Sequence, residues 1–281
     1  MDDVPYLMRG RKTVTTESSV LISSSKFLND GRVREWVVDQ NLRKAGDDVP
    51  LTYGIPSLIA AMRELQDHER IEFLFNEARK DWPELDAWLS ERYLSRLTKA
   101  DLEKCAPESV GGVFYSYLVR QNLQIDIIPT FEPKSAFEYF FLRGVQIHDF
   151  MHILGGVGFD YISETVPAFM KFGNLFRWFG PELAGLLNTQ NTLLVMPGIT
   201  RTLLHYPGSF PAKWKLAQYG MEVGRLSDAL FLPRFEDHLD LTPDEMRAKF
   251  GVRGVQQIDT GALSETSTTE LQDFDAAVVG A

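Results

Sequence analysis

Apolar residues recur every three or four positions along the middle of this chain, a spacing that is typical of amphipathic helices. Leu58, Ile59, Met62 and Leu65 form the first such stripe. The same pattern predicts further helices over residues 71–82, 85–97, 107–121, 135–154, 163–179, 182–196, 200–205, 211–231 and 242–251. Only residues 122–134 look extended, and because they have no partner strand we interpret them as a connector.

The two ends of the chain lack this pattern. Residues 1–50 are polar and weakly patterned, which predicts an arm with one or two short helices. The tail over residues 256–281 is rich in Ser, Thr, Gly and acidic residues, a composition that is typical of disorder. The sequence therefore predicts an all-α protein: a polar N-terminal arm, one helical-bundle-like domain over residues 51–255, and a disordered C-terminal tail.

Three local signals refine the predicted helices. Residues 242–245 (Thr-Pro-Asp-Glu) form a capping box with proline in the first helical turn. Gly220 and Gly224 lie four residues apart and lower helix propensity, so we expect them to allow close contact with another helix. The Pro197-Gly198 pair is expected to end the helix that precedes it.

Composition and charge narrow the range of possible functions. The 281 residues are 44% apolar and 24% charged, as in ordinary soluble globular proteins. The net charge of −10 and the lack of a basic cluster argue against nucleic-acid binding. The single cysteine, Cys105, excludes an internal disulfide and fits a reducing compartment. No segment has the roughly 20 apolar residues that cross a bilayer, and the N-terminus has no apolar signal core.

Candidate chemistry is concentrated between His148 and Glu164. His148 and His152 are four residues apart, so they share a helix face, and Asp149 lies on the edge of that face. Glu164 comes twelve residues after His152, which on one continuous helix would place it about 18 Å away. The glycine-rich segment 155–158 can reverse the chain, because glycine adopts positive φ angles. A second, antiparallel helix can then bring Glu164 back to the imidazoles.

These four side chains are candidate ligands of a divalent metal. Two imidazoles and two carboxylates suit zinc, but they also suit iron or manganese. Four direct zinc ligands would make the site closed and structural, whereas a carboxylate that exchanges for water or substrate would leave it open for catalysis. Spacing alone does not separate a metal site from two histidines that are neighbours by accident.

An aromatic stripe follows the candidate ligands. Phe169, Phe172, Phe176 and Phe179 have the spacing i, i+3, i+7, i+10. This periodicity favours the core-facing side of a helix in a bundle. An apolar tunnel for a long hydrophobic ligand, or a face that lies on a bilayer, would use the same stripe.

The motif His148-Asp149-x-x-His152, followed by eleven residues and then Glu164, resembles that of the ubiquinone (coenzyme Q) biosynthesis protein family called Coq-four. Residues 108–118 (ESVGGVFYSYL) resemble the helix that precedes the motif in that family. The C-terminal part is also similar, through Trp214, Tyr219-Gly220 and the Glu245-x-Arg247 helix that ends at Gly251. The resemblance covers roughly residues 55 to 255. The glycine-rich turn and the segment after Phe179 depart from the family pattern.

The resemblance implies an all-α fold, peripheral contact with the membrane that holds the quinone pathway, prenylated-lipid binding and a role in organising the quinone biosynthetic complex. It also implies removal of the C1 carboxyl group from a polyprenyl-4-hydroxy-3-methoxybenzoate, with hydroxylation at the same carbon as a coupled step. His148, Asp149, His152 and Glu164 would be both metal ligands and catalytic residues. Zinc is the metal that the resemblance favours, with iron or manganese as alternatives.

We accordingly expect a carbon–carbon lyase (a decarboxylase) at the cytoplasmic face of a bacterial inner membrane, bound peripherally. Its expected partners are a polyprenylated aromatic acid or quinone precursor, other quinone biosynthesis enzymes and a second copy of the chain in a homodimer. No nucleic acid is expected among them.

Three other functions compete with this one. A non-catalytic lipid-binding scaffold would keep the metal for folding. A metal-dependent phosphohydrolase of the His-Asp class normally needs a further upstream histidine, and none lies between His68 and His148. A di-iron carboxylate protein would need two Glu-x-x-His-type helices, and only Asp149-x-x-His152 is present. The scaffold is therefore the main rival.

Overall fold

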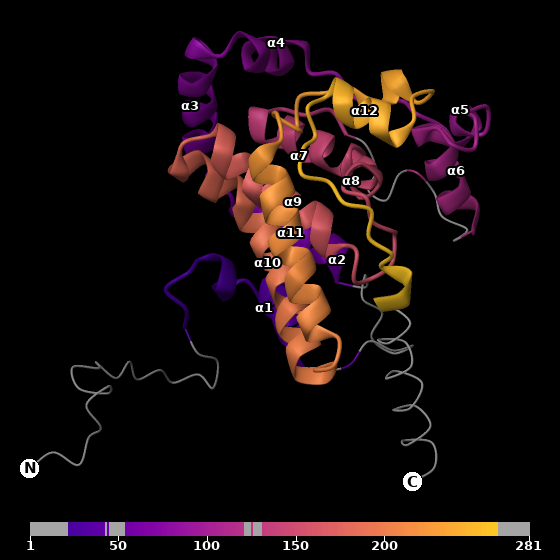
Figure 1. The fold of residues 1–281 in the computed structure, drawn as a ribbon. Helices are drawn as coiled ribbons and strands as arrows, with labels where there is room; N and C mark the ends of the chain where they lie inside the picture. Colours follow the sequence, from indigo (N-terminus) through magenta and orange to yellow (C-terminus); the bar gives the residue numbers. More distant parts are fainter. Residues whose placement is uncertain (1–21, 43, 45–53, 121–124, 126–130, 264–281) are drawn as a thin grey trace, which may run out of the picture.

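A computed structural model describes residues 22–42, 44, 54–120, 125 and 131–263 (Figure 1). Across these ranges the regular secondary structure is helical and includes no strand, which confirms the predicted all-α class. None of the helices in the described ranges is long and apolar enough to cross a membrane. Most of the predicted connector, residues 122–134, lies outside the described ranges, as do residues 264–281 of the predicted tail.

The chain forms twelve α-helices within the described ranges. They are α1 (Gly31–Leu42), α2 (Ile55–Leu65), α3 (His68–Ala78), α4 (Pro83–Glu91), α5 (Lys99–Leu102), α6 (Val110–Arg120), α7 (Ala136–Gln146), α8 (His148–Leu154), α9 (Thr165–Trp178), α10 (Pro181–His205), α11 (Phe210–Leu226) and α12 (Pro243–Lys249). Short 3-10 turns cover Phe27–Asn29, Arg79–Asp81 and Phe235–His238.

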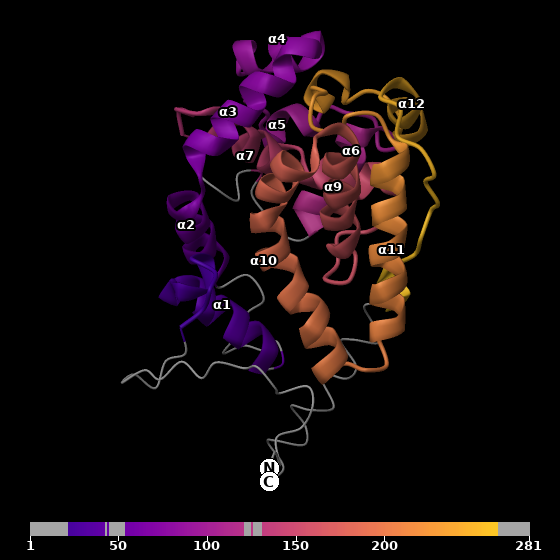
Figure 2. The same cartoon turned by 90° about the vertical axis from the view of Figure 1, so that its left-hand side faces the viewer.

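Three long helices, α9, α10 and α11, run side by side through the middle of the molecule (Figure 2). The pair α1 and α2 packs on the flank of α10 (Figure 2). The short helix α8 contacts α6, α7, α9 and α12 at one end of this layer. Three of the candidate ligands, His148, Asp149 and His152, are therefore held by a helix that is packed on several sides.

Helices α9 and α11 approach each other at glycines. A Cβ atom on Gly224 would lie 2.1 Å from the carbonyl oxygen of Met170, and one on Gly220 would lie 2.6 Å from that of Val166. Real Cβ atoms do not come so close to backbone, so only glycine permits this separation. The predicted close contact at Gly220 and Gly224 is confirmed. It fixes the position of α9, whose first turn follows Glu164.

The prediction that Pro197 ends a helix is wrong, because α10 continues through it from Pro181 to His205. Proline lacks the N–H that would bond to the carbonyl four residues earlier, here that of Leu193. The Trp36 indole N–H donates to this same carbonyl at 2.8 Å. A side chain from α1 thus replaces the missing backbone donor, and the helix is maintained by a contact that the local sequence does not contain.

Both predicted chain ends are partly packed onto the domain. In the N-terminal arm, α1 buries Val33 and Trp36 against Leu58 and Met62 of α2. In the tail, the backbone N–H of Ile258 donates to the carbonyl of Gly156 at 2.8 Å, inside the turn that follows α8. Described residues on both sides of the predicted domain therefore pack against it, and residues 256–263 lie against the candidate site.

Several helix ends differ from their predicted positions. Helix α4 ends at Glu91 instead of residue 97, because Arg92 adopts a left-handed conformation with φ of 50°. Helix α6 begins at Val110, three residues after the predicted start at Pro107. Helix α11 ends at Leu226 instead of residue 231. The loop after α11 is fixed to α9, because the Leu230 N–H donates to Oδ1 of Asn174 at 2.9 Å.

The predicted capping box begins α12. The Thr242 hydroxyl accepts from the Glu245 N–H at 3.3 Å, and the Glu245 carboxylate accepts from the Thr242 N–H at 2.9 Å. Thr242→Ala should lower the free energy of unfolding by about 1 kcal/mol, because a first-turn N–H loses its acceptor. Urea unfolding measures the change, with the exposed mid-helix Thr200→Ala as a control expected to change it by less than about 0.5 kcal/mol.

Candidate metal centre

The candidate ligands lie where two helices meet. The predicted continuous helix over residues 135–154 is interrupted at Ile147, so α7 ends at Gln146 and α8 starts at His148. Ser135 caps α7 as its sequence position suggests, with its hydroxyl accepting from the Glu138 N–H at 3.1 Å. His148 and His152 remain four residues apart on α8, and so the shared face that spacing predicts is preserved.

The chain reverses after α8 as predicted. Gly156 adopts a φ of +71°, a left-handed conformation that favours glycine. Asp160 then organises the approach to α9, because its carboxylate accepts from the N–H groups of Ile162 and Ser163 at 3.1 Å each. Helix α9 starts at Thr165, directly after Glu164. This helix hairpin brings Glu164 back over α8.

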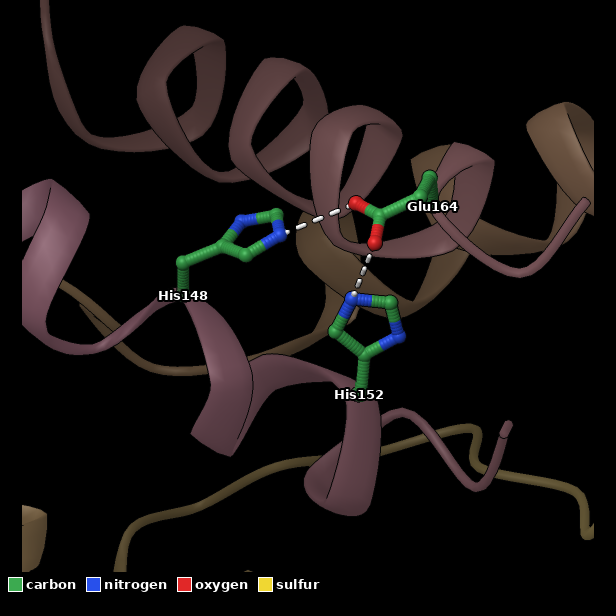
Figure 3. Close-up of side chains that lie close together, drawn as sticks. All are labelled: His148, His152 and Glu164. Atoms are coloured by element: carbon green, nitrogen blue, oxygen red, sulfur yellow. Dashed lines mark hydrogen bonds and ion pairs between the residues drawn. The ribbon is translucent and has the colours of Figure 1, made fainter. Parts of the chain in front are cut away.

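The hairpin brings three of the four candidate ligands together (Figure 3). One oxygen of Glu164 lies 3.0 Å from Nε2 of His148, and the other lies 3.4 Å from Nε2 of His152. One donor atom from each residue falls within 4.8 Å of the other two. Two ligands bound tetrahedrally to zinc at about 2.0–2.1 Å stand about 3.3 Å apart, so these separations suit a metal site.

His152 is held in an orientation that suits a metal ligand. Its Nδ1 lies 2.7 Å from the carbonyl oxygen of Gly158, and because a carbonyl only accepts, Nδ1 carries the proton. A neutral ring would then carry its lone pair on Nε2, which lies 3.4 Å from a carboxylate oxygen of Glu164. Nε2 is buried, and among the described residues it forms no hydrogen bond beyond this contact with Glu164. A backbone carbonyl that accepts from the other ring nitrogen and fixes the tautomer is the usual arrangement for metal-bound histidine, so Nε2 of His152 suits a metal ligand.

Aromatic rings hold His152 from the side. Phe159, in the loop after the turn, stacks on the His152 ring with a centroid distance of 4.9 Å. Tyr117 of α6 stacks in turn on Phe159 at 3.8 Å. Burial raises the pKa of Tyr117 to about 12, with Asp149 and Glu164 adding to the effect, so its hydroxyl stays neutral. Neither ring was identified as part of the site from the sequence, because nothing local to Tyr117 or Phe159 points to the histidines.

The charges of the three candidate ligands shift one another's pKa values. Burial raises the pKa of the Glu164 carboxyl, but the imidazoles of His152 and His148 outweigh it and hold that pKa well below its usual range. Burial lowers the pKa of His148, yet its hydrogen bond to Glu164 and the charge of that carboxylate raise it overall. Glu164 is thus ionised, with 49% of its side chain exposed at the open side of the site. An ionised carboxylate beside two imidazoles attracts a cation from that side.

Asp149 lies beside this group but outside it. It is not among the residues whose donor atoms fall within 4.8 Å of one another. Burial raises the pKa of Asp149 and Glu164 adds to this, while His148 and His152 oppose it. A carboxyl group with a raised pKa next to ligands suits proton transfer better than direct coordination. Its predicted role as a ligand stays a prediction.

The aromatic stripe of α9 is mostly core. Phe169 and Phe179 are buried in two different clusters, and Phe172 packs partly against the first. Phe176 is the exception, with 51% of its surface exposed. The core interpretation is confirmed for the buried members of the stripe. The aromatic rings nearest the candidate ligands come instead from Phe159 and Tyr117.

The fold and the site together define a class: an all-α protein in which a helix hairpin presents two imidazoles and a carboxylate at one end of a three-helix layer. No protein-family model and no curated protein matches the chain. A solved structure does match it, the crystal structure of a protein described as a "putative ubiquinone biosynthesis protein" from Nostoc punctiforme PCC 73102. The TM-score is 0.59 at 17% identity, over 79% of this chain and 96% of that chain. The two chains therefore share a fold.

Proposed function

We propose that this chain is a ubiquinone biosynthesis protein that binds a divalent metal through His148, His152 and Glu164, with Asp149 beside them. The observation that carries the proposal is the buried Nε2 of His152, which faces the ionised Glu164 carboxylate at 3.4 Å and forms no other hydrogen bond among the described residues. The fold shared with the Nostoc protein and the resemblance of the motif to the Coq-four family support the pathway.

The reaction we propose is loss of the C1 carboxyl group from a polyprenyl-4-hydroxy-3-methoxybenzoate. A bound divalent metal would supply a Lewis acid that stabilises negative charge on the substrate. When the carboxylate leaves as carbon dioxide, its bonding electron pair stays on C1, and that carbon must gain a proton. Asp149 is suited to deliver it, because its raised pKa lets the carboxyl group hold a proton nearer neutral pH than an ordinary aspartate.

The coupled hydroxylation at C1 would need dioxygen as a co-substrate and a redox-active metal. Two imidazoles and one carboxylate form a donor set that binds iron(II) in oxygenases and also binds zinc in hydrolytic enzymes. Zinc remains the metal that the resemblance favours for decarboxylation alone. Iron or manganese becomes the expected metal if oxygen is consumed.

The rival proposal is a lipid-binding scaffold whose metal only stabilises the fold. It is favoured by the position of the ligands, because a metal shared by His152 and Glu164 would fasten α8 to the start of α9. In either case we propose contact with a membrane surface, with other quinone biosynthesis enzymes and with a second copy of the chain.

Metal analysis and an activity assay test these proposals together. Elemental analysis of the purified protein should find close to one divalent metal per chain, and removing it with a chelator should lower the melting temperature. At a metal concentration one hundred times the Kd, binding contributes about 2.7 kcal/mol of stability. The protein reloaded with zinc, iron or manganese should release carbon dioxide from a prenylated 4-hydroxy-3-methoxybenzoate, with and without dioxygen.

The outcomes separate the two functions. Carbon dioxide release that depends on the metal supports the enzyme. A stabilising metal with no decarboxylation under any of these conditions would sink the enzymatic proposal and leave the scaffold. A protein that purifies without metal and gains no stability from any of the three would contradict both.

A further inference from the structure

A small pocket lies directly beside the candidate metal ligands. It is enclosed by α7, α8, α9 and the loop after α11, and His148 contributes to its wall. Its other walls are largely apolar and include Phe140, Met151, Leu175 and Phe231. The cavity volume is about 60 Å³, several times the roughly 10–15 Å³ that one water molecule requires. The pocket can therefore hold a small group of several atoms.

Lys171 provides the only positive side chain fixed in that wall apart from the titratable His148. It lies seven residues after Glu164, two turns further along the same face of α9. Its ammonium group sits over the Phe140 ring, 5.2 Å from the centroid. It is also 3.6 Å from the position that a Cβ on Gly144 would take. The amine is therefore directed into the space between α7 and α9.

No carboxylate in the described ranges forms an ion pair with Lys171. The contrast with Arg143 on the adjoining helix α7 is clear, because that guanidinium is paired with Glu236 at 2.6 Å and both side chains are almost fully buried. The remaining polar residue of the pocket wall, Asn174, already donates to the carbonyls of Gly224 and Asp228 and accepts from the Leu230 N–H. An enclosed ammonium group without a counter-ion is unfavourable, and a ligand anion would relieve this cost.

We propose that Lys171 binds the carboxylate of an aromatic acid in this pocket, which places that carboxylate beside His148. The small volume suits the carboxylate itself, so the aromatic ring and the prenyl tail to which it is attached must extend beyond the pocket. Burial lowers the pKa of Lys171 to about 8, so the amine is still mainly protonated at pH 7 and available as a cation. This inference deepens the proposed function and rests on it for the class of substrate.

Binding of 4-hydroxy-3-methoxybenzoate, the soluble head of the proposed substrate, tests the assignment. Isothermal titration calorimetry at pH 7 would compare the full zinc-loaded chain with Lys171→Met and Lys171→Arg. The methionine variant should bind the acid ten- to a hundredfold more weakly, because a hydrogen bond to a charged group is lost. The arginine variant, which keeps the charge, should stay within a few-fold of the natural protein.

Three controls make the result specific. Lys215→Met removes an exposed lysine from α11 and should leave binding unchanged. The uncharged 4-hydroxy-3-methoxybenzamide should bind the natural protein and Lys171→Met equally, because it has no carboxylate that could form an ion pair with the lysine. Zinc content should be the same in the natural protein and in Lys171→Met, and the melting temperature of the variant should be no lower, because an ammonium group without a counter-ion has been removed. Both results would show that weaker binding is not caused by loss of the fold or of the metal site.

Equal binding of the acid by the natural protein and Lys171→Met would overturn the proposal, and so would failure of the natural protein to bind the acid. Inorganic phosphate that binds more tightly than the acid would overturn the assignment to a carboxylate. Gly144→Ala gives an independent check, because its methyl group would enter the pocket 3.6 Å from the amine and should weaken binding. The metal proposal fails separately, through metal content, whatever the lysine variants show.

Discussion

Replacement of Glu164 by glutamine should abolish the proposed metal binding and, with it, the proposed decarboxylation. Glutamine keeps the size of the side chain but loses the charge that faces both imidazoles at 3.0 and 3.4 Å. Changing even the outer partner of a metal ligand costs about 10–100-fold in metal affinity, so loss of a direct ligand should cost at least about 100-fold. The fold should persist, because 49% of the Glu164 side chain is exposed and α9 is held by α11.

Competition with a fluorescent zinc chelator would measure the affinity, and the melting temperature would be followed in the same samples. Glu222→Gln is the matched control, since Glu222 lies on the exposed side of α11 and pairs only with Arg225 among the described residues. It should bind zinc as the natural protein does. Full metal binding by Glu164→Gln would remove Glu164 from the ligand set. Without added metal, Glu164→Gln should melt within a few degrees of the metal-free natural protein.

Gly224→Ala should lower the free energy of unfolding more than any other single methyl group added between α9 and α11. The new Cβ would lie 2.1 Å from the carbonyl oxygen of Met170 and 2.9 Å from the backbone nitrogen of Asn174. Both are backbone atoms, so a side-chain rotation cannot relieve the clash and the helices must separate. Overpacking of this kind costs about 1–3 kcal/mol or more. Because α9 follows Glu164 and carries Lys171, ligand binding should weaken together with stability.

Gly185→Ala is the matched control for this prediction. Gly185 also lies inside a helix, α10, but a Cβ there would meet no atom within 4 Å. Alanine favours the helix over glycine by about 0.5–1 kcal/mol, so this variant should be slightly more stable. Urea unfolding of both proteins gives the two changes. Equal stability of the two variants would show that α9 and α11 do not approach each other as closely as the structure describes.

Local features of the sequence were sufficient for much of the fold. Residues 242–245 form the predicted cap because a capping box involves only atoms within one turn. Gly156 reverses the chain for an equally local reason, its positive φ angle. The i, i+4 spacing of His148 and His152, followed by that reversal, was enough to place both imidazoles near Glu164. These features could be predicted because they depend only on short-range geometry and helical periodicity.

The rest depended on residues that are distant in the sequence. Pro197 ends no helix because Trp36, 157 residues from the Leu193 carbonyl it binds, supplies the missing donor. The start of the tail is ordered because Ile258 bonds to Gly156 in the turn after α8. Neither contact leaves a local pattern, because the donor and the acceptor meet only after the helices have packed.

The candidate metal centre likewise depends partly on local sequence and partly on tertiary contacts. The sequence by itself determined which side chains could gather, through helical spacing and the glycine-rich reversal. Only the tertiary structure decided that Asp149 lies outside the close group and that the Gly158 carbonyl fixes the ring of His152. It also decided that Lys171 faces a largely apolar pocket and has no counter-ion among the described residues. The physical reason is that tautomer, burial and charge depend on neighbours in space, which helical spacing does not specify.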